Sequence, residues 1–229
     1  MKRTASVLFI GNSYTYFHDM PLSIFVPFAA SAGFELEVDA ITKGGYTLTR
    51  YADPADEYGE KVAAALSGKK HYDFVILQEQ SLTPADERAP LFEEAVRNLA
   101  ARIRKIGAQP VLYATWGRKT GSKHLAERGW TNESMTQMLA AAYGKIGTEL
   151  DIPVAHVGQA FYDVCTHHEE IELYNEDRSH PSYGGSYLAA ATLFGKIFGV
   201  DPTSVAYNGE LPAEQAEILR TAAKKAISL

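Results

Sequence analysis

The sequence is poor in cysteine, in long apolar runs and in clustered positive charge. Cys165 is its one cysteine, so no disulfide can form within the chain, which fits a reducing compartment. The apolar stretch Ile24–Ala30 is far too short to span a bilayer. The 22 Lys and Arg residues are scattered among 28 Asp and Glu and form no basic stripe. We therefore expect neither membrane insertion nor dedicated binding of nucleic acid.

The chain is long enough to bury a sizeable core without disulfides or bound metal. It has 229 residues, of which 46% are apolar and 22% charged, and its formal net charge is −6. These values are typical of a globular protein, and they exclude a chain that is mainly disordered or mainly a coiled coil. No linker, repeat or low-complexity tract interrupts the sequence, so we expect a single domain over residues 1–229.

The N-terminus resembles an export signal only in part. Lys2 and Arg3 precede the apolar residues Val7–Ile10, but this stretch ends at residues 11–13, well short of a normal signal-peptide core. We expect a cytoplasmic protein. The alternative is an exported protein whose signal peptide was removed ahead of residue 1.

Short apolar runs recur along the chain between helix-like segments. The runs lack polar alternation, which is typical of parallel strands covered on both faces. Apolar residues spaced by three and four predict helices over residues 92–106, 135–150, 184–198 and 212–227, the second with a capping box from Ser134 to Gln137. The alternation predicts an α/β fold, a three-layer α/β/α sandwich. The five predicted strands are Val7–Ile10, Leu36–Ile41, Phe74–Leu77, Pro110–Ala114 and Pro153–Val157.

Reactive side chains follow the predicted strands, where ligands of open parallel sheets gather. Ser13 comes directly after the first strand, and Asp177 and His180 precede the helix that begins near residue 184. A serine hydroxyl needs an adjacent base to become a nucleophile, and an imidazole can take that proton and return it. An aspartate three residues earlier can orient the imidazole. These three residues are the parts of an acyl-transfer triad.

A tetrahedral oxyanion also needs preorganised hydrogen-bond donors. The backbone N–H groups of Ser13 and Gly45 are two candidates, because glycine allows close approach of the backbone. The side-chain amide of Gln80 is the third, and Gln78 is an alternative to it, since both follow four apolar strand residues and must find partners.

Four motifs, in this order, resemble those of the SGNH/GDSL hydrolase superfamily: FIGNSYT, KGGYTL, LQEQS and DRSHPSYGGSYLAA. The resemblance implies that Ser13 is the block I nucleophile, Gly45 the block II oxyanion glycine, and Asp177 and His180 the block V pair. It also implies a flavodoxin-like sandwich with a five-stranded parallel sheet, and hydrolysis of a carboxylic ester without metal or organic cofactor.

The chain departs from the superfamily pattern at two points. Asn12 stands where the GDS form has aspartate, a change that does not touch the nucleophile. Block III normally reads Gly-x-Asn-Asp, whereas here the aligned stretch is Gln78-Glu79-Gln80-Ser81. Gln80 falls at the asparagine position and carries the same amide on a longer stem.

Simpler structural roles stand beside these interpretations. Ser13 alone reads as a helix cap, and Trp116 as either a packed aromatic or a wall of the substrate pocket. Asn12 and Tyr14, which flank Ser13, are expected to line the substrate pocket. Arg118 either lines the same edge of the pocket or, more simply, is a solvated arginine. The group Cys165, His167 and His168 lacks the paired spacing of a zinc site, so we expect no metal.

The sequence thus predicts a serine esterase that acts on a small ester, an acetyl ester on a carbohydrate ahead of a lipid, because no long apolar lid segment is present. The alternative is a non-catalytic protein that binds a carbohydrate or an anion in the same strand-end crevice. An α/β-hydrolase-fold enzyme fits less well, because Ser13 lacks the second glycine of Gly-x-Ser-x-Gly.

Overall fold

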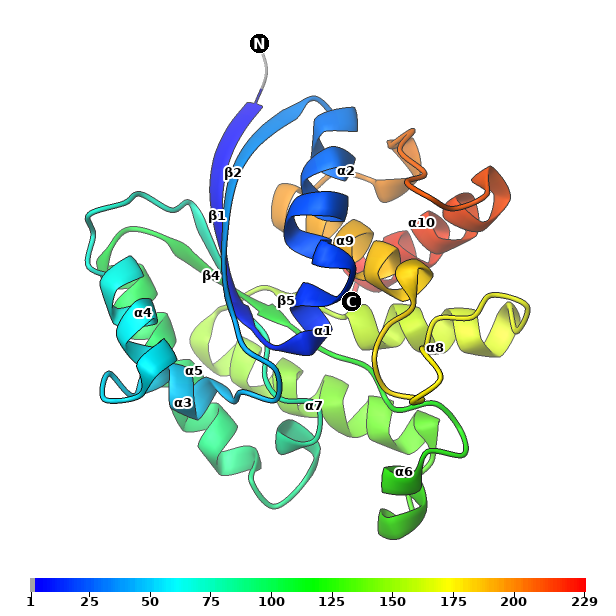
Figure 1. Cartoon of the computed structure of the whole chain (residues 1–229), viewed down its shortest axis with the longest axis horizontal. Helices are drawn as coiled ribbons and strands as arrows, with labels where there is room; N and C mark the ends of the chain where they lie inside the picture. The colour runs from blue at the N-terminus through cyan, green and yellow to red at the C-terminus, as the bar shows by residue number, and fades with distance from the viewer. Residues whose placement is uncertain (1–2) are drawn as a thin grey trace.

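The structure is a computed structural model that describes residues 3–229. Within these residues five parallel strands form one sheet in the order β2-β1-β3-β4-β5. The sheet is flanked by helices on both faces (Figure 1), which confirms the predicted α/β fold and its five-stranded parallel sheet. The strands are β1 (Arg3–Gly11), β2 (Phe34–Thr42), β3 (Phe74–Leu77), β4 (Gln109–Tyr113) and β5 (Val154–Ala155).

Successive strand side chains enter different cores. In β1, Val7 and Phe9 belong to one buried cluster, whereas Leu8 and Ile10 belong to the other. All four side chains are at most 1% exposed. Because both faces of the sheet are covered, the strand reads as an unbroken apolar run without polar alternation.

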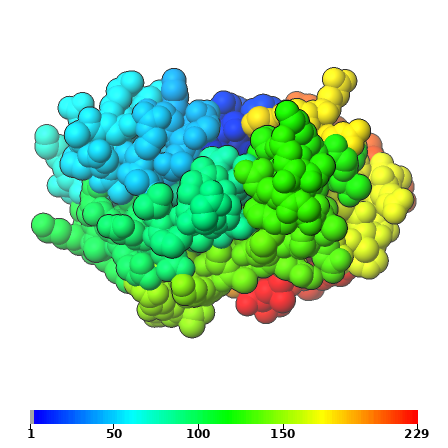
Figure 2. All heavy atoms as spheres, turned by 90° about the horizontal axis from the view of Figure 1, so that it is seen from below, coloured from blue at the N-terminus to red at the C-terminus, as the bar shows by residue number. Residues whose placement is uncertain are grey.

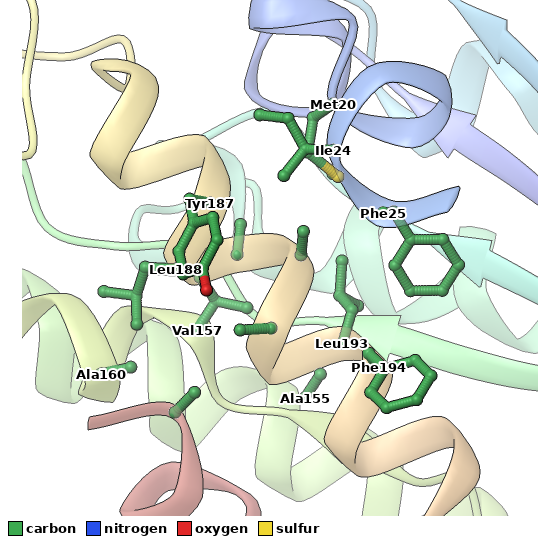
Figure 3. Packing of buried hydrophobic residues seen from close by; sticks show 14 of the residues in the cluster. Met20, Ile24, Phe25, Ala155, Val157, Ala160, Tyr187, Leu188, Leu193 and Phe194 are labelled. Atoms are coloured by element: carbon green, nitrogen blue, oxygen red, sulfur yellow. The ribbon is translucent and has the colours of Figure 1, made fainter. Parts of the chain in front are cut away.

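Helices from distant parts of the chain cover each face. On one face, Leu188, Leu193 and Phe194 of α9 pack with Ile24 and Phe25 (Figure 3). The helices of that face are α2 (Val26–Ser31), α8 (Val157–His167), α9 (Tyr183–Phe198) and α10 (Ala213–Ile227). The other face carries α3 (Leu48–Ala52), α4 (Glu57–Ala65), α5 (Ala89–Lys105) and α7 (Asn132–Leu150).

Short helical segments complete the chain. These are α1 (Ser13–Tyr16), α6 (Lys123–Arg128), a π-helix at Met20–Phe25, and 3₁₀ turns at Phe17–Asp19, Thr83–Ala85 and Pro202–Ser204. Among the helices of residues 3–229, none combines the length and the apolar character needed to cross a membrane.

Two local predictions were wrong. The last strand, β5, ends at Ala155, and Val157 already begins α8, a helix that we did not predict. The helix α7 starts earlier than expected, because its capping box joins Thr131 and Ser134 rather than Ser134 and Gln137. Thr131 Oγ1 accepts from the Ser134 N–H at 3.0 Å, and Ser134 Oγ accepts from the Thr131 N–H at 2.9 Å.

Because all five strands are parallel, their carboxyl ends lie along one side of the sheet. Figure 2 views the molecule from this side. The blue segment that follows β1 lies there beside cyan, green and gold segments. By residue number these are the loops after β2, β3 and β4 and the turn before α9. Side chains from five separated stretches of sequence are thus brought to one surface.

Candidate active site

Ser13 stands where β1 turns sharply into α1. Asn12 caps this helix, with its Oδ1 accepting from the Tyr14 N–H at 3.2 Å, so the capping role considered for Ser13 belongs to its neighbour. The turn requires glycine at position 11, because a Cβ there would lie 2.6 Å from Gln78 Oε1. The Ser13 side chain is left free to face the neighbouring turn.

Asp177 and His180 lie on a tight turn between Tyr174 and Pro181, which form an antiparallel bridge. Arg178 has a left-handed backbone with φ of 61°, which folds the turn back on itself. Asp177 Oδ1 accepts from the His180 N–H at 2.9 Å, and its Oδ2 accepts from the His180 Nδ1–H. The aspartate therefore fixes both the backbone and the ring of His180.

The structure brings Ser13, His180 and Asp177 together from segments 167 residues apart, with His180 Nε2 at 2.8 Å from Ser13 Oγ. Because the carboxylate takes the Nδ1 proton, Nε2 is the nitrogen that accepts from the serine hydroxyl. Partial burial raises the pKa of Asp177, but the hydrogen bonds from His180 and the backbone outweigh it, so the pKa is lowered overall. Asp177 thus stays ionised beside the imidazole at neutral pH.

A cavity of about 470 Å³ opens over this serine. Its lining includes every predicted site residue except Trp116 and Gln78. The predicted residues that line it are Asn12, Ser13, Tyr14, Gly45, Gln80, Asp177 and His180.

Two residues that line the cavity, Ser13 and Gly45, have backbone N–H groups without internal partners. Within residues 3–229, neither the Ser13 nor the Gly45 N–H donates a hydrogen bond. Gly45 has a φ of +71°, a left-handed conformation that a side chain would strain.

The two candidate glutamines have different surroundings. Gln78 is fully buried, and its Oε1 accepts from the Asn12 N–H at 2.8 Å, while its Nε2 donates to the Glu79 carbonyl. Its amide is therefore consumed in holding the turn that carries Ser13. In Gln80 the Oε1 accepts from the Leu82 N–H at 2.9 Å, which fixes the amide and leaves Nε2 without a partner among the described residues. Gln80, and not Gln78, lines the cavity.

No family model and no curated protein matches the chain. Among solved structures, an SGNH hydrolase of Slackia heliotrinireducens is 30% identical, over 83% of this chain and 97% of that one, with a TM-score of 0.74. The chain belongs to the SGNH hydrolases. The predicted superfamily is therefore confirmed.

Other solved structures share the fold of this SGNH hydrolase at lower identity. A DUF4886 family protein of Bacteroides uniformis is 19% identical, with a TM-score of 0.84, over 98% of this chain and 95% of that one. An acetylxylan esterase of Geobacillus stearothermophilus is 16% identical, with a TM-score of 0.61, over 88% of this chain and 98% of that one.

Trp116 does not line the cavity over Ser13 in this SGNH hydrolase, so the pocket-wall prediction was wrong. The indole is fully buried, stacked between Tyr14 at 4.4 Å and Phe161 at 4.0 Å between ring centroids. Its Nε1 donates to the Ser179 carbonyl at 3.1 Å. Trp116 supports the turn that carries His180 from behind, because Tyr14 covers its cavity side and also bonds Ser179 Oγ at 2.7 Å.

Phe17 is a site residue that the sequence analysis missed. Its ring stacks on His180, with centroids 4.4 Å apart and planes within 8°. The two residues after Phe17, His18 and Asp19, adopt left-handed backbone with φ of 55° and 48°. Strained φ values at two adjacent non-glycine residues carry no periodic signal in a sequence, although they often mark functional sites.

Glu79 is a second residue that was missed, although it directly follows β3 like the two glutamines. It is fully buried, and its two oxygens accept from the Gln80 N–H at 2.6 Å and the Leu48 N–H at 3.0 Å. The carboxyl group thus ties the segment of Gln80 to the segment that follows Gly45. Burial raises the pKa of Glu79 to about 7, although these hydrogen bonds act in the opposite direction.

The stability of the wild type relative to Glu79→Gln is expected to fall as pH rises from about 5 to about 7. The folded protein holds the Glu79 proton more tightly than the unfolded chain, whose carboxyl has a pKa near 4.5, so ionisation favours unfolding across this window. The change across this window is about 2 kcal/mol. Urea unfolding of both proteins at several pH values measures it, because the other titrations cancel in the difference. A constant difference across the window would contradict the buried carboxyl.

Cys165 lies away from Ser13, beside a separate cavity of about 500 Å³. Burial raises the pKa of its thiol to about 11, so it is not a reactive thiolate at neutral pH. Within residues 3–229, no three or more His, Cys, Asp or Glu side chains are grouped so as to hold a metal ion.

Proposed function

We propose that this SGNH hydrolase is a serine esterase that removes a small acyl group, an acetyl group, from a carbohydrate. The observation that carries the proposal is the continuous hydrogen-bonded chain from Ser13 Oγ through His180 to Asp177. A nucleophile, a base within reach and a group that orients the base are what acyl transfer requires.

In the first half-reaction, Ser13 Oγ attacks the ester carbonyl carbon while His180 Nε2 takes the hydroxyl proton. Asp177 stabilises the imidazolium and keeps the ring in place. The tetrahedral intermediate collapses, the alcohol leaves with the proton from His180, and an acyl-enzyme remains on Ser13. In the second half-reaction a water attacks the acyl carbon, again giving its proton to His180, and the acid is released as Ser13 regains the proton.

The negative oxygen of the intermediate is held by three donors: the backbone N–H groups of Ser13 and Gly45 and the side-chain Nε2 of Gln80. Their freedom from internal hydrogen bonds supports this role, because donors aimed in advance need no reorganisation when the charge develops. The longer stem of Gln80, compared with the asparagine of the usual block III, is held by the N–H groups of Leu82 and Thr83.

The cavity favours a polar alcohol part over a lipid chain. Besides the residues named above, its lining includes the polar residues Ser81, Ser122 and Arg118. Such walls suit the hydroxyl groups of a sugar, whereas a fatty chain would leave these polar groups unpaired. The likeness in fold to an acetylxylan esterase supports the same substrate class.

A fluorophosphonate probe tests the proposal in one step. We expect a single covalent adduct on Ser13, located by peptide mass spectrometry, and no adduct on Ser13→Ala. The probe reacts with a serine only where a base activates the hydroxyl, so it separates a hydrolase from a non-catalytic binding protein. An unlabelled wild-type protein, or a label that persists in Ser13→Ala, would contradict the proposal.

A further inference from the structure

Two cationic side chains line the cavity of Ser13, although the chain as a whole carries a net charge of −6. Arg118 lines the cavity, together with Lys123 and His124 of α6. Asp177 is the acid among the lining residues, and both of its carboxylate oxygens accept hydrogen bonds from His180. Arg118 and Lys123 therefore outnumber the one acid of the cavity lining.

Arg118 is not the solvated arginine that its sequence position suggested. It is only partly exposed, and its Nη2 donates to Ser81 Oγ at 3.2 Å. The guanidinium lies close to Tyr14, next to the nucleophile, where its charge is the main effect opposing the rise in the pKa of the Tyr14 hydroxyl that burial causes. Its position places a charge in the same cavity as Ser13.

The guanidinium has no acidic partner within residues 3–229, and its Nε is buried without a hydrogen bond. By contrast, Arg50, Arg88 and Arg97 each have a carboxylate, at 2.8, 2.6 and 2.7 Å. A guanidinium has five N–H donors in a fork that matches a carboxylate, so a neutral serine hydroxyl leaves most of its capacity unused.

The neighbours of Arg118 do not neutralise it. His124 Nδ1 is buried without a hydrogen bond, since Glu127 lies 3.7 Å away. Burial and the charge of Arg118 both lower the pKa of His124, so the ring is a neutral hydrogen-bonding group at pH 7. Lys123 is mostly exposed and its Nζ is 3.6 Å from Glu127, a loose surface pair.

We propose that Arg118 forms an anion subsite that binds a carboxylate on the alcohol part of the substrate, so that the ester is an acetylated acidic sugar. This inference rests on the proposed function. An acetyl group fills only a small part of a cavity of about 470 Å³, so the alcohol part occupies the wall at Arg118. The overall charge of −6 disfavours a polyanion, so the acidic group of the proposed sugar is a single carboxylate.

Two matched substrates test the subsite: the methyl glycosides of mono-O-acetylglucuronic acid and of mono-O-acetylglucose, which differ only in the carboxylate. We expect the wild type to show a kcat/KM about tenfold to a hundredfold higher for the acidic ester, the range of one charge-assisted hydrogen-bonded pair. In Arg118→Gln the ratio of the two values should approach one. Arg118→Lys should recover part of it, because lysine keeps the charge but not the fork.

Lys105→Gln is the matched control. It removes one positive charge from the end of α5, which precedes β4 and so lies at the opposite edge of the sheet. The ratio should stay at its wild-type value in this variant. Equal kcat/KM values for the two esters in the wild type, or a preference that survives in Arg118→Gln, would overturn the subsite while leaving the esterase proposal intact.

Binding gives a readout that does not depend on turnover. Ligand-observed NMR titration of glucuronate and glucose against Ser13→Ala should detect glucuronate alone, and adding Arg118→Gln should abolish the signal. If glucuronate does not bind, the subsite is wrong even where Ser13 reacts with fluorophosphonate. If Ser13 does not react and glucuronate still binds through Arg118, the esterase proposal fails and the anion site stands.

Discussion

Replacing Ser13 by alanine is expected to lower kcat for a chromogenic acetate ester by about 10⁴-fold or more, and His180→Ala should have a similar effect. Without Oγ no acyl-enzyme forms, and without Nε2 at 2.8 Å the hydroxyl proton has no acceptor. Because the two groups act as a unit, the double variant should be only slightly slower than either single variant.

His71→Ala is the control for the histidine substitution. His71 is exposed and precedes β3, at the edge of the sheet opposite to Ser13, so its removal should leave the rate unchanged. Circular dichroism would establish that all variants are folded. Rates within a few fold of the wild type for Ser13→Ala or His180→Ala would contradict the proposed mechanism.

The sheet could be predicted because both of its faces are covered. Val7–Ile10 and Phe74–Leu77 are unbroken apolar runs, and the polar residue types begin where each strand ends. The helix α8 was missed, although Val157, Phe161 and Val164 have helical spacing, because Val157 was assigned to the preceding strand. The error was one of boundary, and the periodic signal was present.

The surroundings of individual site residues could not be predicted in the same way. Trp116 follows β4, as a pocket residue would, but Phe161 and Tyr14 from distant segments cover its two faces. Arg118 follows two residues later and does line the cavity. Which of two neighbouring side chains reaches the cavity depends on long-range packing that spacing along the chain does not encode.

The choice between Gln78 and Gln80 has the same origin. The two glutamines are two residues apart, so in a continuing strand their side chains would point to the same side of the sheet. The strand β3 ends at Leu77, however, and beyond it the backbone is held by the hydrogen bond from the Leu48 N–H to the Glu79 carboxylate. Sequence alone therefore left both glutamines as candidates. The partners of each amide, which come from β1–α1 for Gln78 and from the following turn for Gln80, distinguish them.

Gln80→Ala is expected to lower kcat for the same acetate by about 10²- to 10³-fold, the usual loss for one oxyanion donor. Gln80→Glu distinguishes the two roles of Gln80, hydrogen-bond donor to the oxyanion and acceptor within its own loop. The carboxylate still accepts from the N–H groups of Leu82 and Thr83 but offers no N–H to the oxyanion. We expect Gln80→Glu to lose at least as much activity as Gln80→Ala while keeping a melting temperature close to that of the wild type.

Gln78→Ala should behave in the opposite way. It leaves the buried Asn12 N–H and the Thr15 hydroxyl without their acceptor, at a cost of about 1–3 kcal/mol in the free energy of unfolding. The fraction that stays folded should keep more activity than Gln80→Ala, since the Gln78 amide does not line the cavity. A larger loss of kcat in folded Gln78→Ala than in Gln80→Ala would reverse the assignment, because the donor would then lie directly after β3 rather than two residues beyond it.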